Sequence, residues 1–271
     1  MPSMTSLTSL TSLIDAIRSR ARLQLALTAA GLIAVGGCAA FGLNHPATAP
    51  QPLPTIDRPT PTPKAGTNVA ALTDGQAQAA LITQTDLGAP WTATRGAATW
   101  RDWLLKATSS AGQCGRLMDA LYSDELLGGP GRVAIGLDDA DTDAQLRYQI
   151  GARRPADVDA ALAWLKTMPV QCARFTATTQ EGLEEDVRVD DAPLPEVGDA
   201  RQGLRVSLAT TTSEGQETEL TLDVAAVRVG QDAFTLTNGG LGNVPNDATQ
   251  AAVQVGALRL ADVRRQGRAQ V

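Results

Sequence analysis

Histidine is nearly missing from this chain of 271 residues, because the single histidine is His45 in a proline-rich segment. A folded region without histidine cannot form a Ser-His-Asp or Cys-His catalytic site, a two-histidine zinc site or most facial-triad metal sites. Aromatic residues make up 3% of the chain, which argues against base-stacking platforms for single-stranded nucleic acid. The sequence therefore predicts no catalytic residues, no metal site and no cofactor.

Positive charge is scarce beyond residue 37. The chain has 23 basic and 29 acidic residues, and Arg18, Arg20 and Arg22 stand against Asp15 within the first 37 positions. Without that leader, 20 basic and 28 acidic residues remain. A surface with this excess of acid repels phosphate backbones, so nucleic acid is not an expected partner.

The leader, residues 1–37, has the three zones of an export signal. Its arginines precede an apolar run from Leu23 to Val35, which is shorter than the roughly 20 residues that a membrane-spanning helix needs. Val35-Gly36-Gly37-Cys38 then resembles the lipobox of bacterial lipoproteins, in which a peptidase cuts before the cysteine and the cysteine carries lipid. The resemblance implies that Cys38 anchors the mature chain in the outer leaflet of the cytoplasmic membrane, on its extracytoplasmic face.

A segment rich in proline, threonine and alanine follows, with prolines at 46, 50, 52, 54, 59, 61 and 63. This composition favours extended polyproline II structure and cannot build a core. At about 3.1 Å per residue, such a tether would hold a domain up to roughly 90 Å from the membrane. The sequence thus predicts a signal peptide at 1–37, a tether at 38–67 and one folded domain at 68–271.

The folded domain is predicted to mix helices with antiparallel strands. A capping box of Thr73 and Gln76 begins a short helix, and Pro155 suits the first turn of a longer one. Apolar residues three and four apart indicate further helices: Cys114, Leu117, Met118 and Leu121; Val158, Ala161, Leu162 and Leu165; and Ala252, Val255 and Leu258, after an N-cap at Asn246 and ending near Val263.

Alternation with a period of two indicates strands around 133–135, 146–150, 204–208, 220–224, 227–229 and 234–236, with a shift of face before Val227. Short turns at 213–215 and 230–232 join the last strands into an antiparallel meander. We therefore expect an α+β fold with an antiparallel sheet and packed helices.

Two cysteines remain beyond Cys38. In a domain outside the cytoplasmic membrane, Cys114 and Cys172 are expected to form a disulfide, and two buried free thiols are the alternative. Closing a loop of about 58 residues would stabilise the fold by roughly 4 kcal/mol.

A short acidic segment is the best metal candidate. Asp139, Asp141 and Asp143 have the spacing of the first ligands of a calcium loop. Ala144, however, stands where that loop needs glycine, and Ile150 stands where it needs glutamate. We interpret the segment as a solvated acidic turn.

Other clusters also have a functional and a structural interpretation. Carboxylates at 184–186 and 190–191 could supply the two carboxyls of a glycosidase, but their strand-edge and turn contexts favour a solvated surface. Trp91, Trp100 and Trp103 could line a ligand groove, but we favour a role in fastening a long loop to the sheet.

Several short motifs, taken in order, resemble actinobacterial surface lipoproteins, which are similar to the extracellular sensor domain of mycobacterial receptor-type serine/threonine kinases. The motifs are the segment 85–91 (TDLGAPW), Cys114 and Cys172 near two helices, Val197-Gly198-Asp199, and the segment 227–230 (VRVG). The resemblance covers about residues 70–265. It implies a single α+β domain with a cleft for a ligand, but the kinase domains usually have two disulfides and this chain offers one pair. It supplies no catalytic residues.

These observations favour a non-catalytic, membrane-anchored binding domain for a small molecule, a wall fragment or a protein. A lipid or glycolipid carrier is the first alternative, and it would need an apolar cavity. A hydrolase that uses carboxylates without histidine is the second.

Overall fold

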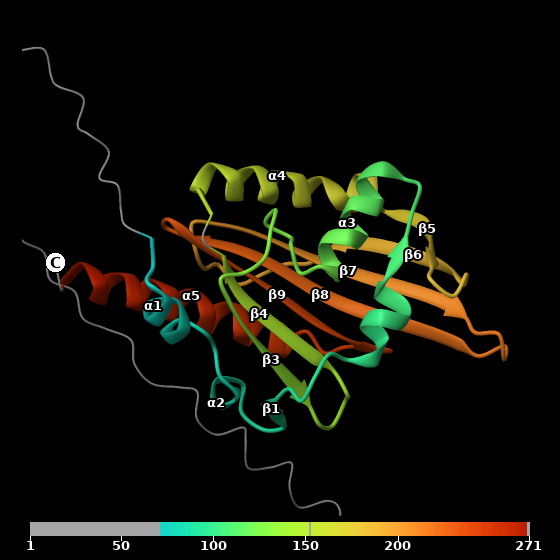
Figure 1. Ribbon diagram of the computed structural model, residues 1–271, viewed down its shortest axis with the longest axis horizontal. Helices are drawn as coiled ribbons and strands as arrows, with labels where there is room; N and C mark the ends of the chain where they lie inside the picture. Colours follow the sequence, from blue (N-terminus) through green and yellow to red (C-terminus); the bar gives the residue numbers. More distant parts are fainter. Residues whose placement is uncertain (1–70, 152, 270–271) are drawn as a thin grey trace, which may run out of the picture. The chain divides into compact units, whose positions relative to one another are not determined.

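Nine antiparallel strands form one sheet at the centre of the computed structural model, which describes residues 71–151 and 153–269 (Figure 1). Their order across the sheet is β1-β3-β4-β9-β8-β7-β6-β5-β2. The bounds are β1 (Trp91–Ala93), β2 (Ala107–Thr108), β3 (Val133–Asp139), β4 (Gln145–Gly151), β5 (Arg174–Thr179), β6 (Glu184–Asp191), β7 (Ala200–Thr211), β8 (Glu217–Val229) and β9 (Asp232–Leu241). The expected meander of β7, β8 and β9 is present, and the predicted α+β class is confirmed.

Helices pack on both faces of this sheet (Figure 1). One face carries α3 (Gly112–Tyr122), α4 (Pro155–Gln171) and the short π-helix η1 (Arg101–Leu105). The other face carries α1 (Asp74–Ala79), α2 (Gln84–Leu87) and the long α5 (Asp247–Ala269). None of the helices among residues 71–151 and 153–269 is both long and apolar enough to cross a bilayer.

Each helical layer has its own hydrophobic core, and β8 belongs to both. Leu222 and Val224 of β8 pack towards α3 and α4, whereas Ala225 and Val227 pack towards α5. A strand that is buried on both faces has no polar side to mark its orientation. The shift of face expected before Val227 is present within a single strand, because β8 runs without interruption from Glu217 to Val229 and Val227 faces the side opposite to Val224.

Local sequence signals locate several helix ends correctly. Thr73 Oγ1 accepts a hydrogen bond from the Gln76 amide at 3.2 Å, and the Thr73 amide donates to Gln76 Oε1 at 2.9 Å, which completes the capping box of α1. α4 begins at Pro155, where the missing amide proton costs no helical hydrogen bond. The predicted apolar faces of α3 and α4 are buried.

The last helix differs from its prediction in length and in orientation. α5 continues beyond Val263 to Ala269, and Leu258 is 57% exposed. Its buried side instead consists of small residues and a few larger ones, namely Ala252, Val253, Gly256, Ala257 and Leu260. A Cβ atom on Gly256 would lie 2.7 Å from the Tyr148 ring, so this helix approaches the sheet too closely for a larger side chain at that position.

Candidate ligand-binding groove

One face of β5, β6 and β7 remains open to solvent. Their inward side chains pack against the α3 and α4 layer, while α5 packs against β8 and β9 on the opposite face. Thr176, Glu184, Asp186 and Ala209 point outwards and are exposed. Side chains alternate between the two faces of a strand, so a helix on one face leaves the outward residues of these strands uncovered.

The strand register aligns these outward residues in rows across the sheet. One row contains Thr176, Asp186, Ala209 and Glu219, which are direct partners on β5, β6, β7 and β8. The next row contains Arg174, Arg188, Ser207 and Thr221. Neighbouring side chains in such a row lie about 5 Å apart, so one bound molecule can contact several strands.

These rows line a continuous hollow, which we call the sheet-face groove. A cavity of about 1270 Å³ lies over the end of the sheet where β6 begins and β7 ends. A second cavity of about 560 Å³ extends it along the same face, and the two share Thr176, Asp186, Ala209 and Glu219. The exposed lining consists mainly of Arg174, Thr176, Glu184, Asp186, Arg188, Ser207, Ala209, Thr211, Glu217 and Glu219.

Charge is unevenly distributed along the sheet-face groove. Glu184, Asp186, Glu217 and Glu219 lie at one end, and none of them forms an ion pair within the described residues. At the other end, Arg188 is engaged by Asp190, with Nε 2.7 Å from Oδ2. The groove therefore offers free carboxylates, together with threonine and serine hydroxyls, to a polar ligand that carries hydrogen-bond donors or positive charge.

Glu185 lies between two groove residues but faces the opposite way. Its side chain is fully buried, and neither carboxylate oxygen has a hydrogen-bond partner. Burial raises the pKa of Glu185 to about 7. The interpretation of residues 184–186 as a solvated surface is thus wrong for Glu185, because the alternation of β6 directs this residue into the core.

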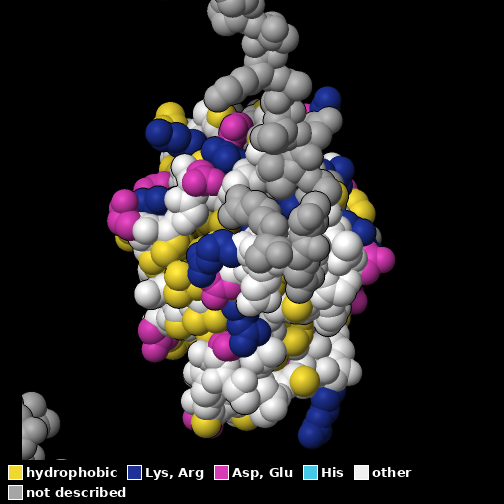
Figure 2. All heavy atoms as spheres, turned by 90° about the vertical axis from the view of Figure 1, so that its left-hand side faces the viewer, with side chains coloured by type: hydrophobic (Ala, Val, Ile, Leu, Met, Phe, Trp, Pro, Cys, Tyr) yellow, Lys and Arg dark blue, Asp and Glu magenta, His cyan; other side chains and the backbone are white. Residues whose placement is uncertain are grey.

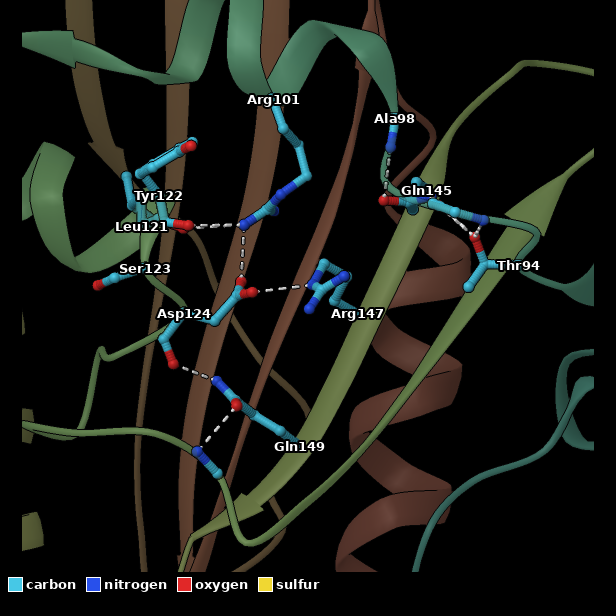
Figure 3. Close-up of polar contacts among 12 residues, drawn as sticks. Thr94, Ala98, Arg101, Leu121, Tyr122, Ser123, Asp124, Gln145, Arg147 and Gln149 are labelled. Atoms are coloured by element: carbon cyan, nitrogen blue, oxygen red, sulfur yellow. Dashed lines mark hydrogen bonds and ion pairs between the residues drawn. The ribbon is translucent and has the colours of Figure 1, made fainter.

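A network of polar side chains holds the connecting loops on β4 (Figure 3). Asp124 accepts from the Arg101 guanidinium at 3.0 Å and pairs with Arg147 at 2.9 Å. Arg101 also donates to the Tyr122 carbonyl near the end of α3. Burial lowers the pKa of Arg101, and the Asp124 carboxylate counteracts this effect. Gln149 contacts the Asp124 carbonyl and accepts from the Gly131 amide.

A second glutamine on β4 secures the segment that leads to η1. Gln145 accepts from the Ala98 amide at 3.1 Å and donates to the Thr94 hydroxyl at 3.0 Å (Figure 3). These side chains contact other groups of the protein and hold its loops, so we assign them a structural role. No periodicity in the sequence marked Asp124, whose backbone has φ of 59°.

The tryptophans serve packing. Trp100 and Trp91 are 5% and 8% exposed and belong to different hydrophobic cores, while Trp103 is partly buried against the first core. Burial thus agrees with the expected packing role, although Trp91 also contributes to the wall of a cavity of about 330 Å³.

The acidic segment after β3 is a local turn. Asp139 Oδ1 accepts from the amides of Asp141 at 2.8 Å and Thr142 at 3.2 Å. Among the residues that the structure describes, no group of three or more potential metal ligands comes together.

Cys114 and Cys172 are joined by a disulfide that links α3 to the end of α4. The lipidation residue, Cys38, lies outside the described residues, so its acylation stays a prediction.

Comparison with known proteins gives matches among solved structures alone. Neither a family model nor a curated protein sequence matches the chain. Among solved structures, the chain is similar to the extracellular domain of PknH from Mycobacterium tuberculosis, with 16% identity and a TM-score of 0.41. The similarity covers 73% of this chain and 99% of the PknH domain.

Proposed function

We propose that this protein is a lipid-anchored, extracytoplasmic binding domain that captures a polar ligand, such as a fragment of the cell wall, in the sheet-face groove. The groove itself is the observation that carries the proposal. It is open, spans several strands and presents four carboxylates that form no ion pair with any residue in the described part of the chain. Unpaired groups of this kind form charge-assisted hydrogen bonds with ammonium and hydroxyl donors.

The arrangement of the carboxylates supports binding rather than catalysis. A general acid needs a raised pKa and must reach the substrate. Glu185 has a raised pKa, but its buried carboxylate lies on the other side of the sheet from Glu184 and Asp186. We therefore assign no acid–base chemistry to the sheet-face groove.

The lining also favours a polar ligand over a lipid. A lipid carrier needs an apolar cavity, whereas threonine and acidic residues line the sheet-face groove. A smaller cavity of about 330 Å³, between Leu87, Trp91 and Val244, has a more apolar wall. Co-purified lipid in native mass spectrometry would point to the carrier function and would count against the proposal.

The proposal can be tested with full-length protein in a neutral detergent and a library of wall fragments. We expect fragments with free amino groups to raise the thermal unfolding temperature of the native protein. Ala209→Trp, which fills the centre of the groove, and Asp186→Asn should each reduce the affinity at least tenfold in calorimetry.

The matched control is Ala134→Trp, which places the same bulk at an exposed position on β3, outside the groove. It should bind like the native protein. Equal binding by Ala209→Trp and native protein, or no binding by any wall fragment, would overturn the proposal.

A further inference from the structure

A second hollow lies between α3 and α4, on the side of the molecule away from the sheet-face groove. Its volume is about 370 Å³, which is in the range of small-molecule sites. Arg116 of α3, Leu127 of the following turn, and Arg153, Ala161 and Trp164 at or within α4 form its walls. We call it the α3–α4 groove.

The floor of the α3–α4 groove has a fixed aromatic surface. The Arg116 guanidinium lies 4.0 Å from the centre of the Trp164 ring, and the indole Nε1 of Trp164 donates to Gln113 Oε1 at 2.9 Å. Leu127 is 5% exposed and adds apolar surface beside the ring. The stacked Arg116 guanidinium covers one face of the indole, and the hydrogen bond to Gln113 sets its orientation, so the uncovered part of the ring is held in place before any ligand arrives.

Two arginines in this groove form no direct ion pair. Within the described residues neither Arg116 nor Arg153 has a carboxylate within ion-pair distance, although most arginines there do. Asp157, whose pKa is lowered chiefly by its hydrogen bond to Arg154, also interacts electrostatically with Arg153 at longer range. The only carboxylate in the lining is Asp157, and Arg154 already binds both of its oxygens at 2.8 and 2.9 Å. The lining of the groove thus carries a net positive charge, whereas the overall charge of the chain is negative.

A further feature supports an anion at this position. The helix dipole of α4 places positive partial charge at its first turn, next to Arg153. Figure 2 views the molecule from the end where α4 begins, and basic, acidic and hydrophobic side chains lie close together in the upper part of that view. Guanidinium groups next to an apolar ring surface suit a ligand that combines a ring with an anionic group.

We propose that the α3–α4 groove binds a small ring compound, the size of a monosaccharide, that carries a carboxylate or a phosphate. The ring lies on Trp164 and Leu127, and the anion is held by Arg116 and Arg153. This site is separate from the sheet-face groove and does not depend on the function proposed for it.

Three sugars that share one ring test the proposal. N-acetylmuramic acid carries a carboxylate, N-acetylglucosamine 6-phosphate carries a phosphate, and N-acetylglucosamine is neutral. Full-length, ¹⁵N-labelled protein in a polyoxyethylene detergent is titrated with each sugar, and the indole N–H signal of Trp164, assigned with Trp164→Phe, is followed by NMR. We expect a saturable shift with the anionic sugars and none with the neutral sugar, and 0.5 M salt should weaken binding several-fold. The tighter of the two anionic sugars identifies the preferred anion.

Variants distinguish binding in the α3–α4 groove from nonspecific electrostatic attraction. Arg116→Gln and Arg153→Gln should each weaken binding at least fivefold. Arg95→Gln removes the same charge from an exposed side chain that lies outside the groove lining, and it should leave the affinity unchanged. An equal response to all three sugars, no response to any, or equal loss in all three variants would overturn the proposal. All three arginine side chains lie at the surface or are half-buried, so thermal unfolding should confirm that the variants fold.

Discussion

Glu185 illustrates how strand alternation can place a charge where its neighbours would not suggest it. Glu184 and Asp186 are exposed, and the residue between them is fully buried without a hydrogen-bond partner. Burial of a carboxylate favours its protonated form, because the charged form loses its hydration. The residue therefore links the stability of the fold to pH.

The direction of this link follows from the two pKa values of Glu185. The pKa is about 7 in the folded protein and 4.5 without the protein environment, so the folded state holds the proton more tightly. The contribution of Glu185 to stability is most favourable below pH 4.5 and is lost as the pH rises to 7. We expect Glu185→Gln to remove this loss, which amounts to about 3 kcal/mol in the free energy of unfolding.

Urea unfolding of Glu185→Gln and of native protein at pH 4.5 and at pH 8 measures the effect. The advantage of the variant over native protein should be larger at pH 8 than at pH 4.5. Glu184→Gln, the exposed neighbour, should follow the native protein at both values. A variant advantage that does not change with pH would contradict the burial of a titrating carboxylate.

At the scale of elements, the disulfide connects the two helices of one layer. Cys114 lies near the start of α3, and Cys172 caps the end of α4, 58 residues later. In the unfolded chain such a bridge restricts a long loop, which lowers the conformational entropy of the unfolded state. It also ties together the two helices that form the α3–α4 groove.

The double variant Cys114→Ala, Cys172→Ala should lower the free energy of unfolding by about 4 kcal/mol relative to the oxidised protein. Denaturant unfolding with and without a reducing agent measures this difference. Reduction should destabilise the native protein and leave the double variant unchanged. If reduction left the native protein equally stable, the bridge would not contribute to the fold.

Elements were predictable where one physical signal dominated. The spacing of Leu117, Met118 and Leu121 shows the buried side of α3, since bulky apolar residues cover it. In α5 the spacing of the larger residues was misleading, because Gly256 and Ala257 allow close approach to the sheet and Leu258 is left outside. Helix orientation there depends on the Tyr148 ring, which belongs to a strand more than 100 positions away in the chain.

The two grooves depend on still longer-range information. The alternation of β6 is visible in Val187 and Val189, but which side of the strand stays uncovered is decided by where α4 and α5 pack. Arg116 and Trp164 are likewise separated by 48 positions and meet only when α3 and α4 are side by side. Short motifs therefore indicated the class of fold, whereas the candidate sites required the packed structure.

At the scale of the whole molecule, the lipid anchor proposed at Cys38 would decide where both grooves act. We expect Cys38→Ala to release the protein from membranes, because the variant lacks the thiol that would carry lipid. Fractionation of cells that express the native protein or the variant measures this. Cys38→Ser is a second variant. It keeps a polar side chain of similar size but has no thiol, so it should also be released. Unchanged membrane association of both variants would contradict lipidation at Cys38.

The strands at the two margins of the sheet matter for a protein held at a membrane, as proposed here. β1 and β2 comprise three and two residues, and they cover the sides of the longer strands β3 and β5. A long free margin would let the sheet of one molecule continue into the next. Proteins held on a surface meet their neighbours often, and margins this short give a neighbouring strand little to pair with. The sheet thus leaves one face open to a ligand, while its short edge strands limit pairing with the sheet of a neighbouring molecule.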